Sequence, residues 1–520
     1  MSVSLVVLGV SLVLTVALGL LAARRQEGGG LAGWSVGGRS LGPVFIWVLM
    51  AGEGYTSFSY LGAAGWGYDH GAPVLYVVAY MSCGYAVGYV VGPMLWGYAR
   101  KHGLVALSDT AAHRYRRPWL GAAVAVLATV FLLPYIQLQI TGMGVVVSTV
   151  SYGRIGLGPA YFLAFAVTTG FVVVSGLRGS AWVSVLKDSL VILTLGFLAV
   201  YVPFHYFGGF GEFFGRLVGE KGEWLSLPGH GGERSGYGVG WFASTTVLNS
   251  LTVVIFPTTV AGYLGARDAD ALRRNAVWLP AYNVLLFVPM LLGAAALFVV
   301  PGLTGAESNL ALLKLVTDSL PGWAVGIVGV AAALSSIVPM AVFMLVIGTM
   351  WGRSVFGLVP RLRAREKGLS QLVVVAAGTL ALVLTYTAPN TLVRLSLISY
   401  EGMAQLLPLL LLGLVWRRMS LVGGVCGLVV GVVIVCVLVF SGNDPFLGVN
   451  AGLLALVANL AVAVPVSLFG RPGGGDADDD RPDEDVLALE EFTDAALPLA
   501  GQGKTAPGAG TSVPGRASSR

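Results

Sequence analysis

The chain has 520 residues, of which 56% are hydrophobic and 11% charged, against about 25% charged residues in ordinary soluble domains. Its mean hydropathy is +0.80, and apolar runs of about 20 residues, each long enough to cross a bilayer, recur from end to end. This composition excludes an ordinary soluble protein. The net charge of +5 does not indicate nucleic-acid binding, because the basic residues fall in short loops between apolar runs, as membrane topology requires.

The length criterion predicts an all-α polytopic membrane protein with about thirteen transmembrane helices. Their expected ranges are 4–23, 43–66, 73–99, 119–148, 158–175, 180–203, 241–265, 276–300, 322–350, 370–388, 391–415, 420–440 and 447–469. No basic residue precedes the first helix and Arg24-Arg25 follows it, which favours a retained helix with its N-terminus outside over a cleaved signal peptide. The cysteines Cys83, Cys426 and Cys436 lie in apolar runs, so we expect buried small side chains rather than a disulfide or metal site.

The loops between these helices indicate the orientation. Roughly 19 Lys and Arg fall on the side that holds Arg24, and roughly five fall on the other side. We therefore expect an integral plasma-membrane protein with its C-terminus in the cytoplasm. The long loops 204–240 and 301–321 would be external, and the amphipathic second loop would lie on the membrane surface or cap an external vestibule. An acidic stretch leads into a Gly/Ala/Pro/Ser-rich tail, 471–520, which is typical of a disordered cytoplasmic segment.

The second expected helix is interrupted by the run Ala51-Gly52-Glu53-Gly54-Tyr55-Thr56-Ser57. Two glycines flank a carboxylate and hydroxyl side chains follow, so this run forms a poor helix. Irregular backbone at membrane depth is tolerated only where it is buried in protein or lines a watery cavity. Transporters use such broken helices to hold an ion or a solute, so the run indicates a transporter.

The expected helix 322–350 contains the pair Ser335-Ser336. Adjacent hydroxyls in a helix can simply bond back to the carbonyl groups four residues earlier. Facing a broken helix, they gain a second interpretation. About five oxygen ligands suit a small hard cation, and the set would comprise the carbonyls of Gly52, Tyr55 and Ala332 and the hydroxyls of Ser335 and Ser336.

From Arg24 to Phe469 the chain resembles the sodium:solute symporter family with the LeuT-type fold. The residues that carry the resemblance are Gly37-Gly38-Arg39-Ser40, Tyr60-Leu61-Gly62, Gly65-Trp66-Gly67-Tyr68, Tyr135 with Gln139 and Gly142, Gly176-Leu177-Arg178-Gly179-Ser180-Ala181-Trp182, and the Ala-Ala-x-x-Ser-Ser set at 332–336 and its flank. The resemblance implies a 5+5 inverted-repeat core with a broken first core helix, and Na⁺ bound by the oxygens of Gly52, Tyr55, Ala332, Ser335 and Ser336. It divides the chain into 1–42 (first helix and loop), 43–415 (ten-helix core), 416–470 (two C-terminal helices) and 471–520 (tail).

One position departs from the family pattern. Many members carry Asp two residues after the Trp of the Gly-Leu-x-x-x-Ala-Trp motif, where this chain has Ser184. The acid here is Asp188, with Lys187 beside it. Asp188 would serve the ion exit path, or Lys187 and Asp188 would form a structural pair within the bundle, since ionisable groups at membrane depth usually serve function.

The solute is less sharply indicated. Three local sequences resemble those of the monocarboxylate permeases: Glu53–Phe58, Phe256-Pro257-Thr258-Thr259 and Tyr400–Pro408. This resemblance implies that the solute is lactate, pyruvate or propionate. Sodium- or proton-coupled transport of an amino acid, sugar or vitamin is the alternative. The candidate solute-binding residues are Glu53, Thr56, Ser57, Ser59, Gln139, Asn249, Glu401 and Gln405.

Several polar groups admit two interpretations. A carboxylate would be stabilised by helix N-terminal amides near Thr56 or by Arg394, which would otherwise extend to the lipid headgroups. Glu53 and Glu401 would repel an anion unless protonated or paired, so they would instead bind a proton, a second cation or a substrate amine. Gln137 and Gln139 would line the cavity or bond between helices, as Asn249 also would.

Other functional classes are less favoured. The five histidines form no HExxH-like pair, and no catalytic motif stands in a plausible context, so we expect no enzyme. No filter repeat indicates a channel, and the tail indicates no sensor domain. The expected partners are a small solute, Na⁺ or H⁺, and membrane lipid, with no nucleic acid, no required protein partner and no cofactor beyond the coupling ion.

Overall fold

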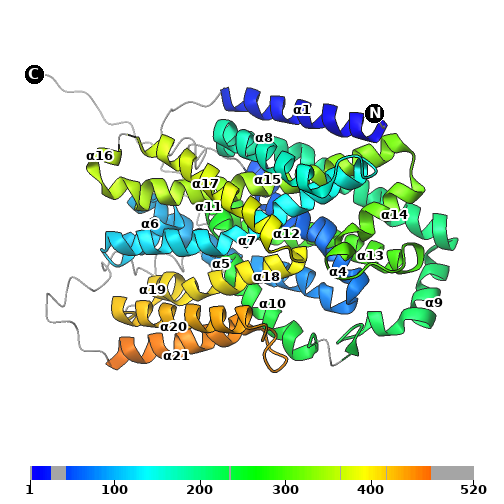
Figure 1. The fold of residues 1–520 in the computed structure, drawn as a ribbon. Coiled ribbons are helices and arrows are strands. Elements are labelled where there is room, and N and C mark those ends of the chain that lie inside the picture. Colours follow the sequence, from blue (N-terminus) through cyan, green and yellow to red (C-terminus); the bar gives the residue numbers. More distant parts are fainter. Residues whose placement is uncertain (1–2, 25–42, 233–235, 364, 417, 470–520) are drawn as a thin grey trace, which may run out of the picture.

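The computed structural model describes residues 3–24, 43–232, 236–363, 365–416 and 418–469. The motif at 37–40 and the tail 471–520 lie outside the described residues, as does the side chain of Glu53. Helix is the only regular secondary structure that this part of the chain forms, apart from an isolated bridge between Phe446 and Val449. The helices form one bundle (Figure 1).

The first half of the bundle contains α1 (Val3–Arg24), α3 (Pro43–Gly54), η2 (Phe58–Gly62), α4 (Ala63–Asp69), η3 (Ala72–Leu75), α5 (Tyr76–His102), α6 (Leu107–Arg114), α7 (Pro118–Val150), α8 (Leu157–Phe207), α9 (Phe210–Lys221) and η4 (Gly222–Leu225).

The second half contains α10 (Val239–Val253), α11 (Pro257–Gly265), α12 (Ala269–Asn283), η6 (Val284–Leu286), α13 (Phe287–Val299), η7 (Gly305–Leu310), α14 (Ala311–Ser319), α15 (Gly322–Ser354), η8 (Phe356–Leu358), α16 (Pro360–Arg363), α17 (Glu366–Thr387), α18 (Leu392–Met403), η9 (Ala404–Leu406), η10 (Pro408–Leu412), α19 (Gly413–Val415), α20 (Leu421–Phe440) and α21 (Ala451–Phe469).

Ten helical segments of the described residues are long and apolar enough to cross a membrane, and two shorter apolar helices cover Val3–Gly19 and Leu157–Val173. The two separate spans expected at 158–175 and 180–203 form one continuous helix, the 51-residue α8. The sequence predicts about thirteen spans, of which 43–66 is interrupted by the run 51–57. No continuous helix covers that segment, because α3 ends at Gly54 and helix resumes at Ser57.

A second interrupted helix corrects the prediction of one unbroken span at 241–265. Here α10 ends at Val253 and α11 begins at Pro257. Pro257 has no N–H, and a proline disfavours helical geometry in the residue before it. Phe256 accordingly has a ψ of 130°. The chain crosses the gap in a turn, in which Ile255 N donates to Thr252 O at 3.1 Å.

The two breaks occupy equivalent places in the order of the helices. Five apolar segments run from 43 to 207 and five from 239 to 415, and in each set the first segment is interrupted. A pair of interrupted segments in corresponding halves is the usual indication of a transport site at the repeat interface. The helix α15 lies at the centre, packed on α7, α8, α1 and α17, and its most apolar window is completely buried.

The peripheral helices lie on opposite edges of the bundle in Figure 1, with α1 along one edge and α20 and α21 along the other. Arg394, expected to bind a carboxylate or to extend to the headgroups, forms an ion pair with Asp444, whose side chain is 1% exposed. Cys83 and Cys426 are exposed rather than buried. The amphipathic helix α14 packs its apolar face on α4, α7, α13 and α15, so it caps the bundle.

Glycines allow the half-helix α4 to touch its neighbours through backbone atoms. A Cβ on Gly293 of α13 would lie 2.0 Å from Ala64 O, and one on Gly65 would lie 2.7 Å from Ser308 O. Such close approach through small residues is typical of membrane helix interfaces. It fixes α4 against α13 and η7.

Replacing Gly293 by alanine would force α4 and α13 apart and destabilise the protein by about 1–3 kcal/mol. We expect a lower melting temperature for purified Gly293→Ala in detergent. The control is Gly196→Ala on α8, where no atom lies within 4 Å of the added Cβ. Equal melting temperatures for the two variants would contradict this account of the interface.

Candidate ion and solute site

The unwound segment between α3 and η2 satisfies its own backbone with side-chain hydroxyls. Ser59 Oγ donates to Gly54 O at 2.5 Å and accepts from Thr56 N at 3.0 Å. Thr56 Oγ1 accepts from Phe58 N at 3.1 Å. Short hydroxyl side chains commonly replace backbone partners in this way, and buried N–H and C=O groups need such partners. The hydroxyl-rich run therefore keeps the break stable away from water.

Ser57 ties the break to two helices. Its N–H donates to Gln139 Oε1 of α7 at 3.3 Å, and its Oγ lies 2.5 Å from Ser336 Oγ of α15. The approach of α7 requires Gly142, because a Cβ there would lie 2.4 Å from Ser57 Oγ. Segments far apart in the sequence thus meet at one serine.

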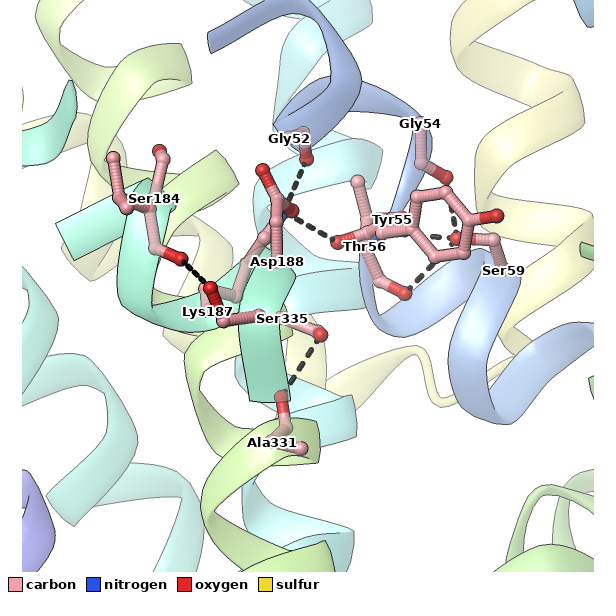
Figure 2. A network of polar contacts seen from close by, with 12 residues as sticks. Gly52, Gly54, Tyr55, Thr56, Ser59, Ser184, Lys187, Asp188, Ala331 and Ser335 are labelled. Atoms are coloured by element: carbon pink, nitrogen blue, oxygen red, sulfur yellow. Dashed lines mark hydrogen bonds and ion pairs between the residues drawn. The ribbon is translucent and has the colours of Figure 1, made fainter. Parts of the chain in front are cut away.

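A third helix reaches the break through a buried ion pair. Lys187 of α8 donates from Nζ to Gly52 O at 2.9 Å and to Tyr55 O at 3.2 Å, as Figure 2 shows. The same Nζ lies 2.9 Å from Asp188 Oδ1, and the side chains of Lys187 and Asp188 are 0% and 4% exposed. The two hydrogen bonds from Lys187 therefore hold α3 and the break to α8, and Asp188 on the same helix offsets the charge of the ammonium, whose carboxylate partner would be costly to remove.

The oxygens expected to bind sodium all lie in buried parts of α3, the break and α15, and the structure gives several of them other partners. The carbonyls of Gly52 and Tyr55 accept from Lys187. Ser335 Oγ donates to Ala331 O at 2.9 Å, and Ser336 Oγ donates to Ala332 O at 3.3 Å. Sodium binding by this set stays a prediction of the family likeness.

A small cavity of about 20 Å³ lies beside the second break, with room for about one water molecule. Met81 connects it to the first break, because a Cβ on Gly54 would lie 3.3 Å from Met81 Cε. Aromatic rings form much of the wall, with Phe256 stacked on Tyr400 at a centroid distance of 4.8 Å. The lining residues are Met81, Tyr85, Tyr135, Val253, Phe256, Thr258, Thr259, Phe343 and Tyr400.

The candidate solute-binding residues fall into separate groups. Thr56, Ser57, Ser59 and Gln139 lie together at the first break. Asn249 is buried on α10. Gln139 Nε2 and Asn249 Oδ1 have no hydrogen-bond partner among the described residues. Glu401 Oε2 and Gln405 Oε1 also lack a partner among the described residues, so four residues of the predicted set keep a polar atom that is able to contact a ligand.

Glu401 and Gln405 lie apart from this group, at the contact with α21. Glu401 Oε1 accepts from Asn450 Nδ2 at 2.9 Å, and Gln405 Nε2 donates to Gly452 O at 3.1 Å. Gln137 also bonds between helices, donating to Ala388 O at 2.8 Å. The sequence did not indicate which face of each helix these residues occupy, because a helix that is apolar on all sides carries no marker of its inner face.

Three features carry part of the family resemblance, but the sequence alone indicates no role for them: Tyr135, Tyr400 and the Phe256–Thr259 run. The dipeptide Phe256-Pro257 was the available signal for the second break, since a proline within an apolar run interrupts helix geometry. Met81, Tyr85 and Phe343 carried no comparable signal, because an apolar residue in an apolar helix does not show that it faces a cavity.

Residues 34–431 match the sodium:solute symporter family. The chain belongs to the sodium:solute symporter family. As a member of that family, this sodium:solute symporter is an integral multi-pass membrane transporter that binds a solute and Na⁺, and it is not an enzyme.

Relatives of the symporter match it along nearly its whole length. The Bacillus subtilis symporter YhjB is 34% identical over 484 residues, which cover 91% of this chain and 98% of that protein. A monocarboxylate transport permease protein of Rhizobium johnstonii is 28% identical, covering 88% of this chain and 94% of that one. The high-affinity proline transporter PutP of Bacillus subtilis is 22% identical, covering 84% and 94%.

Solved structures show the same fold. A Na⁺-coupled sialic acid symporter in a substrate-bound outward-open state superposes with a TM-score of 0.74 at 13% identity, covering 90% of this chain and 98% of that one. Mhp1, a nucleobase-cation-symport-1 family transporter in a closed conformation, gives 0.52 at 15% identity, covering 88% and 98%. The symporter therefore has the LeuT-type fold that its sequence predicts.

Ser336→Ala removes the hydroxyl that ties the first break to α15. We expect solute uptake to fall at least about tenfold, because losing a short buried hydrogen bond leaves Ser57 Oγ without this partner and frees the break. The amount of protein in the membrane should stay near the wild-type level. The measurement is uptake per inserted molecule.

The matched control is Ser370→Ala on α17. Ser370 is also buried and donates to a carbonyl four residues earlier, Glu366 O, but it does not touch the break. Unchanged uptake and unchanged sodium dependence in Ser336→Ala would remove Ser336 from the transport site.

Proposed function

We propose that this symporter carries a small monocarboxylate such as lactate, pyruvate or propionate into the cell by alternating access. The observation that carries the proposal is the aromatic wall beside the first turn of α11. The cavity there has a volume of about 20 Å³ in this conformation, so it would have to widen to admit the acid. A small acid needs both an apolar wall for its short chain and donors for its carboxylate.

The first turn of α11 provides those donors. The first N–H groups of a helix have no partner within the helix, and the helix dipole favours an anion there. Pro257 has no N–H, so Thr258 provides the first amide of the turn that can serve a carboxylate. Thr258 lines the cavity, as does its neighbour Thr259. The sequence placed this role near Thr56, where the hydroxyls of the break instead accept or donate within their own segment.

The walls favour a compact, weakly polar solute. Tyr135, Phe256 and Phe343 form a contiguous group, with centroid distances of 4.7 Å between Tyr135 and Phe343 and 5.8 Å between Tyr135 and Phe256. Such rings suit a methyl or ethyl group better than a sugar, whose hydroxyls would each need a partner. The likeness to the Rhizobium johnstonii permease supports the same class of solute.

Amino-acid symport is the second candidate, and the likeness to PutP favours it over a sugar or vitamin. It requires a group that recognises the substrate amine. Glu53 and Glu401 are the sequence candidates for that contact. The side chain of Glu53 lies outside the described residues, and Glu401 accepts from Asn450 through Oε1 while its Oε2 has no partner among the described residues.

Alternating access would move the first break relative to α15. Lys187, Gln139 and Ser336 hold that break to α8, α7 and α15. A coupling ion must bind one conformation better than the other, so ion and solute would have to act on the same elements. With the N-terminus outside, the exit path would run past the cytoplasmic end of the 180–203 segment and Asp188.

Uptake of radiolabelled pyruvate, lactate and propionate by vesicles carrying the symporter tests the solute class. We expect excess unlabelled short monocarboxylates to abolish uptake, whereas glucose and proline leave it unchanged. Repeating the measurement with and without a sodium gradient at several pH values identifies the coupling ion. Competition by proline but not by propionate would replace the proposal with amino-acid symport.

Thr258→Val should raise the KM for the monocarboxylate about three- to tenfold, since one lost hydrogen bond costs about 0.5–1.5 kcal/mol. Valine preserves the size of the side chain, so the cavity keeps its shape. Thr379→Val, at an exposed position on α17, is the control and should keep the wild-type KM. A wild-type KM in Thr258→Val would show that the Thr258 hydroxyl does not contact the solute, because valine keeps the backbone amide.

A further inference from the structure

The ammonium of Lys187 is surrounded by oxygen. Gly52 O, Tyr55 O and Asp188 Oδ1 lie 2.9, 3.2 and 2.9 Å from Nζ. The ammonium donates hydrogen bonds to the two carbonyls and forms an ion pair with the carboxylate. Two of them are the carbonyls that the family likeness assigns to sodium.

We infer that Lys187 provides a tethered cation at this point of the bundle, and that Na⁺ does not bind between the carbonyls of Gly52 and Tyr55 in the wild-type protein. The inference goes beyond the proposed function, because it concerns the cation position and holds for any solute.

A metal ion and the ammonium would compete for the same oxygens. Na⁺ bound to Gly52 O and Tyr55 O would lie beside Nζ, which already contacts both atoms. Two positive charges at such a separation repel strongly where the surroundings are apolar. Asp188 Oδ1 lies 2.9 Å from the ammonium and offsets its charge.

The remaining oxygens of the expected sodium shell are also engaged. Ser335 Oγ donates to Ala331 O, and Ser336 Oγ donates to Ala332 O and contacts Ser57 Oγ. Each serine gives up its hydrogen in a bond within α15 and keeps the lone pairs of its oxygen. The obstacle to sodium is therefore the ammonium at the carbonyls of Gly52 and Tyr55, and the serine oxygens become sodium ligands only when that ammonium is removed.

Small residues admit the lysine to this place. A Cβ on Gly52 would lie 3.2 Å from Lys187 Nζ and 3.5 Å from Ser184 Oγ. Ser184 Oγ donates to Ser180 O at 3.0 Å within α8, so its hydroxyl is directed to its own helix. The long side chain of Lys187 thereby reaches a carbonyl 135 residues away in the sequence.

A tethered cation has a different consequence from a bound ion. Like a bound sodium ion, the ammonium of Lys187 holds the broken helix to α8. Unlike a bound sodium ion, it cannot leave with the solute. Sodium that is taken up with the solute then binds at another place in the chain.

Sodium-dependent thermal stability, measured on purified protein without solute, tests the inference. Melting temperatures are compared in sodium chloride and in choline chloride at equal ionic strength. Wild type, Ser335→Ala, Lys187→Ala and the double variant Lys187→Ala/Ser335→Ala are measured, with Lys314→Ala on α14 as the control for losing a lysine.

The expected result is a sodium effect that depends on Ser335 only when Lys187 is absent. Lys187→Ala leaves Asp188 facing an open set of oxygens, so sodium should raise its melting temperature by about 3–5 °C. The double variant should lose that rise. Any sodium effect should be the same in the wild type, in Ser335→Ala and in Lys314→Ala.

Two results would overturn the inference. A sodium effect in the wild type that disappears in Ser335→Ala would place the metal among these oxygens beside the lysine. The absence of any sodium effect in Lys187→Ala would show that the ammonium does not stand in for sodium. If Lys187→Ala does not fold, binding of ²²Na⁺ to wild type and to Ser335→Ala decides alone: Ser335-dependent binding contradicts the inference, and its absence supports it.

Because no solute enters this assay, a wrong assignment of the solute class leaves its outcome unchanged. The uptake experiment can therefore disprove the monocarboxylate proposal without affecting the inference about Lys187, and the stability assay can disprove that inference without affecting the solute class.

Discussion

An unwound stretch of backbone within a membrane must find hydrogen-bond partners for every exposed N–H and C=O, because lipid offers none. In this symporter that constraint falls on the segment from Gly52 to Ser59. Its own hydroxyls satisfy some of the groups, and side chains from α7, α8 and α15 satisfy others. The helices that meet at the break are therefore held together by the groups that the break exposes.

The same constraint connects the two halves of the bundle. The second break, before Pro257, lies beside the cavity, and Met81 connects that cavity to Gly54. Helix ends present unpaired amides and carbonyls at both places. An anion is suited to the amides of α11 and a cation to the carbonyls of α3, so a solute and a positive charge can be held by neighbouring elements. Motion of either break would change both sites.

In this symporter the side chain of Lys187 lies where the family resemblance implies a sodium ion. The carbonyls of Gly52 and Tyr55 are in place, and the charge beside them is a side chain. Its neighbour Asp188 balances that charge within the same helix. Adjacent residues of a helix do not normally face one another, and the pair forms here because the lysine side chain is long enough to bend back to the carboxylate while reaching α3.

The sequence by itself determined the membrane class, the approximate positions of the helices and the first break. Hydropathy and the run Gly52-Glu53-Gly54 are local properties, so they can be read without knowing which helices are neighbours. The resemblance supplied the family, which the comparisons confirm. Only the tertiary structure decided that Lys187 reaches Gly52, that Glu401 turns to Asn450 and that Arg394 pairs with Asp444. Each of these contacts depends on the rotation of a helix about its own axis, and a helix that is apolar all round does not encode that rotation in its sequence pattern.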